Sequence, residues 1–100
     1  MKKSTSREII QEKKSPVEIG KLGLSALKDL VNKPVEQIVS VVKDDQGWKA
    51  VIETLERKAV PDTQDLLGRY ELEFSPGGKL LNYRQIMVRR RSDLIDERGK

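Results

Sequence analysis

The sequence predicts an α+β domain in which one amino-terminal helix packs on a three- to four-stranded antiparallel sheet. One stretch has helical apolar spacing, and later runs alternate apolar and polar residues between turn-forming segments. The length of 100 residues suits one small domain. The composition changes at about residue 15. We therefore expect a disordered, flexible charged arm at residues 1–15, a single domain at residues 16–91, and a frayed carboxyl-terminal tail at residues 92–100.

The helix is predicted to run from Pro16 to about Val31. Ser15 is a suitable cap, proline suits the first helical position, and Glu18 stands where the acid of a capping box reaches back. Apolar residues then recur at spacings of three and four, which predicts one buried stripe. The stripe consists of Leu24, Leu27, Leu30 and Val31.

The valine-rich segment after the helix fits two structures. Four of its apolar residues have helical spacing: Val35, Ile38, Val39 and Val42. However, β-branched side chains and the following turn sequence "DDQG" favour a strand. We predict a strand over residues 37–43 that turns into a second strand from Trp48 to about Ala59. A helix over residues 35–43 is the alternative.

The second half of the chain predicts another hairpin. Pro61 ends the preceding strand, and Asp62 is expected to cap a short helical turn that carries Leu66 and Leu67. The run "RYELEF" alternates between two faces, one with Tyr70, Leu72 and Phe74 and the other with Arg69, Glu71 and Glu73. The glycines of "SPGGK" suit a turn, and the last strand follows over residues 79–90.

The composition excludes several kinds of site. The chain has no cysteine and no histidine, which removes disulfides, thiolate nucleophiles, Ser-His arrangements and the commonest ligands of transition metals. We therefore expect no metal and no cofactor. An enzyme would have to work with carboxylates, lysines, arginines or tyrosines alone, and we expect no enzymatic activity. No continuous apolar run is long enough for a signal peptide or a membrane span, so we expect a soluble protein that is not secreted.

The acidic residues have structural interpretations. Glu71 and Glu73 lie on one face of the strand before the last turn, where they are expected to oppose Arg84 or another arginine across the final hairpin. A calcium site at Asp62 and Asp65 would need more oxygen ligands at regular spacing than "PDTQDLLG" supplies.

Three consecutive arginines end the last strand. Because strand residues alternate faces, Arg89 and Arg91 are expected on one side and Arg90 on the other. Only Tyr83 is near enough to supply an aromatic ring for base stacking. Three interpretations stay open: a solvated or salt-bridged strand end, a protein-docking surface, and a nucleic-acid-binding site that also uses the lysines of residues 1–14.

From about Ala26 onward, the ordered motifs resemble those of the gas vesicle protein O family. The run "ALKDLVNKPVEQIVSVVKDDQGWKAVIETLE" is similar to the family's helix, small loop, valine-rich segment and Gly-Trp step. The runs "VPDTQDLLGRYELEF" and "GGKLLNYRQIMVRRR" resemble its Pro-Asp, Tyr-Glu, Gly and Tyr-Arg positions. The chain departs from the family at Ala59, where an arginine is usual, and at Val88, where an aromatic is common.

This resemblance implies a non-enzymatic accessory role in gas vesicle formation, through contacts with other gas vesicle proteins. The expected location is the gas vesicle or the cytoplasm, without membrane insertion and with the oligomeric state open. The expected partner-binding residues lie on the sheet face and the last strand: Trp48, Glu53, Glu56, Tyr70, Glu71, Tyr83, Arg84, Arg89 and Arg91. Trp48 is equally well explained as a core residue. The alternative function is a nucleic-acid-binding regulator.

Overall fold

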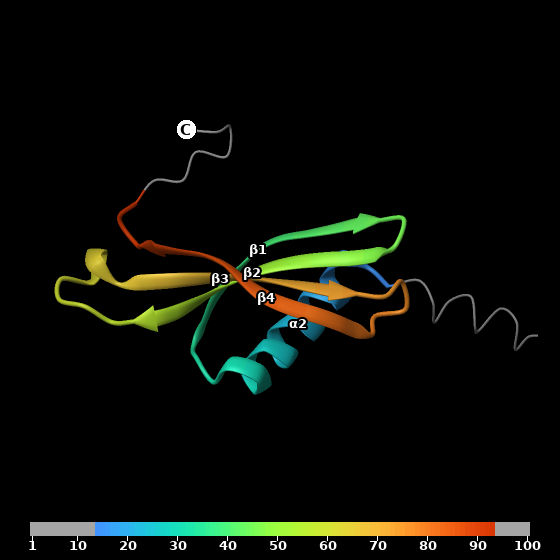
Figure 1. Ribbon diagram of the computed structural model, residues 1–100, viewed down its shortest axis with the longest axis horizontal. Coiled ribbons are helices and arrows are strands. Elements are labelled where there is room, and N and C mark those ends of the chain that lie inside the picture. Colours follow the sequence, from blue (N-terminus) through green and yellow to red (C-terminus); the bar gives the residue numbers. More distant parts are fainter. Residues whose placement is uncertain (1–13, 94–100) are drawn as a thin grey trace, which may run out of the picture.

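The chain folds into one helix on a four-stranded antiparallel sheet, as the computed structural model in Figure 1 shows for residues 14–93. The predicted fold class is confirmed. The elements in chain order are α2 (Pro16–Val31), β1 (Val35–Asp44), β2 (Gly47–Arg57), the short 3₁₀ helix η1 (Asp62–Gln64), β3 (Leu66–Phe74) and β4 (Leu80–Arg90). The strands lie side by side in chain order, so β1 and β4 are the two edges. The predicted arm and tail lie almost entirely outside the described residues.

The start of α2 is fixed by the predicted capping box. The Ser15 hydroxyl accepts a hydrogen bond from the Glu18 backbone N–H at 3.2 Å, and the Glu18 carboxylate accepts one from the Ser15 N–H at 2.9 Å. Two of the helix's unpaired donors are thereby satisfied. The helix ends at Asn32, which adopts a left-handed conformation with φ of 52°.

The buried side of α2 is rotated from the predicted stripe toward its glycines. Leu27 is fully buried as expected, but Leu30 is 40% exposed. Gly20 and Gly23 are buried instead, and a Cβ added at Gly23 would lie 2.9 Å from the Ile52 Cδ1 atom. The missing side chains let the helix approach the sheet closely, which offsets the low helix propensity of glycine.

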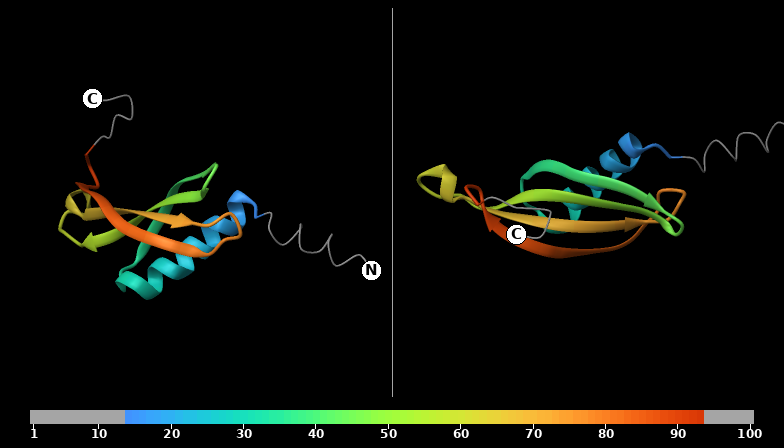
Figure 2. Two further views of the ribbon diagram at one scale, coloured as in Figure 1. Left: turned by 45° about the vertical axis from the view of Figure 1, so that its right-hand side comes forward. Right: turned by 90° about the horizontal axis from the view of Figure 1, so that it is seen from above.

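The core lies between α2 and one face of the sheet. Alternate residues of β2 and β3 point toward the helix, and the cluster comprises Ile19, Leu27, Trp48, Ala50, Ile52, Tyr70, Leu72 and Phe74. Figures 1 and 2 show that α2 covers the end of the sheet near the turns after β1 and β3. The other end, near η1, extends beyond the helix. A different set of interactions must hold that end together.

The structure also corrects several expected boundaries. Residues 35–44 form a strand rather than the alternative helix, and β2 ends at Arg57, before Ala59. The predicted helical turn after Pro61 is present as η1, but it ends at Gln64 and does not carry Leu66 and Leu67, which belong to β3 and pair with β4. Ladder pairing of these apolar residues outweighs the local turn preference.

The expected cap at Asp62 is wrong as well. The cap position of η1 is occupied by Pro61, and no side chain caps this short helix. Asp65 holds the segment instead, because its carboxylate accepts the Ala59 backbone N–H at 2.7 Å. Because η1 has only three residues, few of its backbone N–H groups need a cap. Asp65, which follows η1, fixes the loop through its bond to Ala59 instead.

Gly47 provides a stability test of the first hairpin. Its φ of 142° is rarely adopted by other residues, and an added Cβ would collide with the Phe74 carbonyl oxygen. We expect Gly47→Ala to lower the free energy of unfolding by about 2 kcal/mol or more. Gly77 is the matched control, because no atom lies within 4 Å of an added Cβ there.

Urea unfolding of both variants, followed by circular dichroism, measures the difference. Gly77→Ala should stay within about 0.5 kcal/mol of the wild type. Equal stability of the two variants would contradict the close approach at Gly47.

Candidate functional site

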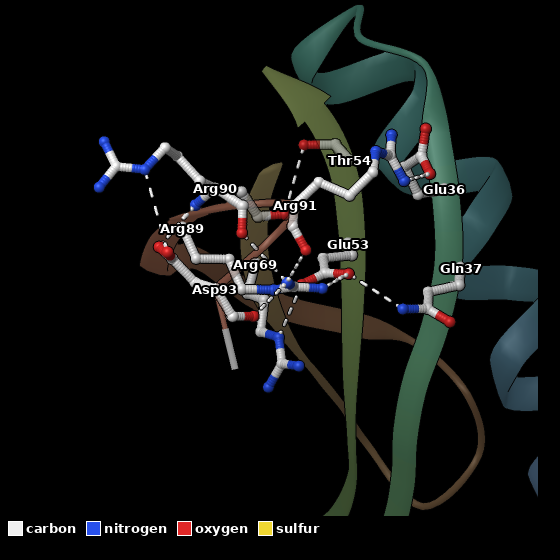
Figure 3. A network of polar contacts seen from close by, with 10 residues as sticks. Glu36, Gln37, Glu53, Thr54, Arg69, Arg89, Arg90, Arg91 and Asp93 are labelled. Atoms are coloured by element: carbon white, nitrogen blue, oxygen red, sulfur yellow. Dashed lines mark hydrogen bonds and ion pairs between the residues drawn. The ribbon is translucent and has the colours of Figure 1, made fainter. Parts of the chain in front are cut away.

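A buried carboxylate, Glu53, lies at the centre of a network that joins all four strands (Figure 3). Glu53 is 0% exposed although it points away from α2. Arg89 of β4 donates to both of its oxygens, with an Nε to Oε2 distance of 2.7 Å and an Nη2 to Oε1 distance of 3.2 Å. The network, called the Glu53 cluster below, comprises Gln37, Glu53, Arg69 and Arg89.

Each strand supplies one member of the Glu53 cluster. Gln37 on β1 and Arg69 on β3 lie directly opposite Glu53 in the ladder. The Gln37 Nε2 atom donates to Oε1 at 3.0 Å, and the Arg69 Nε atom donates to Oε2 at 3.0 Å. A buried carboxylate is stable only when hydrogen bonds and opposite charge replace its water, and all three donors serve that purpose.

These donors keep Glu53 ionised. Burial alone raises the pKa of the Glu53 carboxyl. The hydrogen bonds from Arg89, Gln37 and Arg69 have the opposite and larger effect, so the pKa falls from the ordinary 4.5 to about 2. At neutral pH the group therefore has no proton to donate, and its lone pairs are occupied by the cluster. Both properties fit a structural ion network better than acid or base catalysis.

A second carboxylate, Glu56, is held on the opposite face of the sheet. The Lys33 Nζ atom lies 2.6 Å from Glu56 Oε1, while the hydroxyls of Thr54 and Tyr70 donate to Oε2 at 2.8 Å and 3.3 Å. Burial raises the pKa of Glu56, but the Lys33 hydrogen bond and the two hydroxyls bring it below its usual value. A Cβ on Gly68 would lie 2.5 Å from Glu56 Oε2, so glycine makes room for this carboxylate.

A third cluster ties the chain after β4 to the η1 loop. The Arg91 guanidinium contacts Asp65 Oδ2 at 3.2 Å and Glu36 Oε1 at 3.1 Å. Its backbone N–H donates to the Asp65 carbonyl at 2.8 Å, and Ser92 N–H donates to the Thr63 carbonyl at 2.9 Å. The hydrogen bonds to Glu36 and Asp65 raise the pKa of Arg91. The end of the sheet that α2 does not cover is thus closed by charged groups.

The three arginines separate as the strand alternation predicts. Arg89 reaches Glu53 and also donates to the carbonyls of Arg90, Arg91 and Asp93 at 3.2 to 3.3 Å. Figure 3 shows Arg90 pointing away from the Glu53 cluster, and its Nε lies 3.9 Å from Asp93 Oδ1. To bind phosphate, Arg89 would have to leave Glu53, and Arg91 would have to leave Glu36 and Asp65. The geometry therefore does not favour a nucleic-acid-binding site.

The remaining predicted partner-binding residues fall into two environments. Trp48 and Tyr70 are buried in the core, which matches the core interpretation of Trp48. Glu71 and Arg84 form the expected cross-strand pair, with Arg84 Nη2 3.0 Å from Glu71 Oε1. Arg84 and Tyr83 are exposed on β4.

Sequence reasoning did not identify several residues that complete these networks: Lys33, Glu36, Gln37, Asp65 as a loop anchor, and Arg69 as a donor to Glu53. Gln37 and Arg69 face Glu53 only in the observed register, which is interrupted by bulges on either side of β2. The available signal was Glu53, which directly follows the apolar run of residues 50–52 in β2, together with arginines on both later strands.

The described residues offer little for metal chemistry or membrane crossing. Within residues 14–93, no group of three or more His, Cys, Asp or Glu side chains could hold a metal ion. No helix in that part of the chain is long and apolar enough to span a membrane.

Glu53→Gln tests how much the central carboxylate stabilises the fold. The amide has nearly the same shape but leaves two arginines beside a neutral, buried group. We expect the free energy of unfolding to fall by about 3 kcal/mol or more. The matched control is Glu71→Gln, because its partner Arg84 has a side chain that is 65% exposed. Breaking that surface pair should change stability by less than about 1 kcal/mol. Similar losses in both variants, measured by urea unfolding, would contradict the structural role of Glu53.

The lowered pKa of Glu53 predicts a pH dependence of stability. The unfolded carboxyl binds its proton near pH 4.5, whereas the folded one does so only near pH 2. The contribution of the cluster is therefore fully present above about pH 4.5 and is lost as pH falls toward 2. The stability difference between wild type and Glu53→Gln should be constant from pH 7 to 5 and shrink below about pH 4.5. A difference that shrinks already near pH 6 would contradict the assigned pKa.

Comparison with known proteins agrees with the motifs in the sequence. A family model described as "Gas vesicle synthesis protein GvpO" matches residues 2–94. Gas vesicle protein O1 of Halobacterium salinarum is 39% identical over 72 residues, which cover 72% of this chain and 60% of that relative. Gas vesicle protein O of Haloferax mediterranei is 38% identical over 73 residues, which cover 72% of this chain and 52% of that relative.

A protein of the same name from Streptomyces sp. is 33% identical over 72 residues, which cover 72% of this chain and 56% of the relative. The aligned region thus amounts to a little over half of the length of these relatives. No solved structure matches the chain. The family model spans nearly the whole chain, and the chain belongs to the gas vesicle synthesis protein GvpO family.

Proposed function

We propose that this protein is an accessory component of gas vesicle formation that works by binding other gas vesicle proteins rather than by catalysis. The match of the family model over residues 2–94 is the observation that carries the proposal. The proposed location is the cytoplasm or the gas vesicle itself. No cofactor, metal or small-molecule substrate is part of the proposed role.

The state of the ionisable groups supports a binding role. Glu53 and Glu56 are engaged by cations and hydroxyl donors from neighbouring elements, and Asp65 is engaged by Arg91. These bonds satisfy the carboxylates inside the fold. Groups held in this way stabilise a surface, whereas a catalytic acid or base needs a titrating proton within reach of a substrate.

The predicted partner-binding residues then divide by role. Buried Trp48, Tyr70 and Glu53 maintain the sheet, together with Glu56 and Arg89, whose side chains are largely covered. The accessible members are Tyr83 and Arg84, with Glu71 beside Arg84, whereas Arg91 is held by Asp65 and Glu36. We place the proposed contact surface on these accessible residues, because arginine and tyrosine are enriched at protein interfaces.

The assembly role is tested by deleting the gene in its gas-vesicle-forming host and restoring it on a plasmid. We expect fewer or misshapen vesicles after deletion and recovery with the wild-type gene, as seen by electron microscopy. Normal vesicle number and shape in the deletion strain would contradict the role.

The contact mechanism is tested separately by pull-down of each co-encoded gas vesicle protein with the purified chain. Arg84→Glu should reduce capture of the partner, while Lys21→Glu on the helix should not. Arg89 is unsuitable for this purpose, because changing it removes a partner from buried Glu53. If no co-encoded protein is captured by the wild type, the contact mechanism is wrong.

A further inference from the structure

The outer edge of the sheet at β4 is open in the part of the chain that the structure describes. β4 pairs only with β3, and α2 packs chiefly on β1 and β2. Figure 2 shows the helix on the far side from this strand's outer edge. An edge strand of this kind presents backbone donors and acceptors that can pair with another strand.

The exposed side chains of β4 are unusually apolar for an open edge. They are Leu81, Tyr83, Ile86, Met87 and Val88. Leu81 and Ile86 are the extra residues at the two bulges of β4 against β3. A bulge normally hinders the pairing of an edge strand with another chain. Here, however, each bulge leaves a large apolar side chain in solvent. Contiguous exposed apolar groups on one strand mark an interaction surface.

The charge on β4 indicates what kind of partner fits. The strand has no acidic residue, while the side chains of Arg84 and Arg90 are 65% and 57% exposed. Pairing with a second copy of β4 would align two arginine-bearing strands without an acid on either to compensate, which is unfavourable. An acidic partner meets no such repulsion.

Both faces of β4 carry apolar and cationic side chains. On the helix side of the sheet lie Tyr83, Val88 and Arg90, and on the other side lie Arg84 and Met87. A strand added to this edge would meet apolar groups and a cation on each face. A partner segment that carries both apolar and acidic residues satisfies this combination.

We propose that the β4 edge binds a short extended segment of another protein, with apolar and acidic side chains, as a fifth strand of the sheet. The proposal rests on the proposed function and adds the chemistry of the partner. The bulges limit the regular ladder to residues 82–85 and 87–90, and the Asp93 carboxylate already accepts the Arg90 N–H at 3.0 Å. The bound segment is therefore short and centred near Ile86.

A peptide titration tests this surface directly. The probe is a synthetic peptide of about nine residues in which valine and glutamate alternate. Two control peptides replace glutamate by lysine or place proline at the centre, which removes a backbone donor. We expect binding of the glutamate peptide alone, weaker at high salt, with amide shifts in NMR spectra confined to β4 and its neighbours. Equal binding of the three peptides, or none, would overturn the proposal.

Two matched variants locate the binding edge. Val88→Asp adds an acid on β4, where the side chain is 51% exposed, and Val42→Asp adds the same acid on β1, where it is 57% exposed. We expect Val88→Asp to weaken binding of the glutamate peptide by about tenfold or more and Val42→Asp by less than about twofold. The reverse order would place binding at β1 and overturn the proposal. Circular dichroism melts of both variants verify that folding is retained.

The same variants separate this inference from the proposed function. If the wild type and Val88→Asp capture a gas vesicle protein equally well, the assignment of the contact to β4 is wrong. The proposed contact mechanism is then still supported. Sedimentation of the wild type adds one more outcome. A dimer that Val88→Asp converts to monomer would show a second copy on β4 and overturn the acidic-segment assignment.

Discussion

The buried carboxylate of Glu53 is the constraint on which this fold depends. It lies on the face of the sheet that points away from α2, and its donors Gln37, Arg69 and Arg89 come from the three other strands. A register slip of one residue would turn a donor to the opposite face and leave a buried charge unpaired. One ion cluster therefore fixes the alignment of all four strands on the face that α2 does not cover.

The two halves of the sheet are stabilised by different interactions. Near the turns after β1 and β3, α2 and its glycine face pack an apolar core. Toward η1, the carboxylates of Glu53, Glu56 and Asp65 take the place of that core. Charges used in this way hold the strands in register. The sheet has two edge strands, β1 and β4, and the proposed binding role places the partner at β4.

The helix, the antiparallel strands and the two faces of β2 and β3 were predictable because they depend on local spacing, whereas the buried side of α2 was predicted only in part. The capping box of Ser15 and Glu18 and the pair of Glu71 with Arg84 depend on short separations and were found correctly. The Glu53 cluster was not found, because it needs the registers of β1, β2 and β3, which bulges shift. The helical turn expected at Leu66 failed for the related reason that ladder pairing with β4 decides its conformation. Residues that touch across several strands cannot be inferred from the periodicity of any one of them.

Glu53 and Arg89 stabilise the fold through each other. A double-mutant cycle measures this most directly, with Glu53→Gln, Arg89→Gln and the double variant unfolded in urea at pH 7. The coupling between the two positions should exceed about 1 kcal/mol, with the double variant losing much less than the sum of the single losses. Additive losses, with a coupling near zero, would contradict the account.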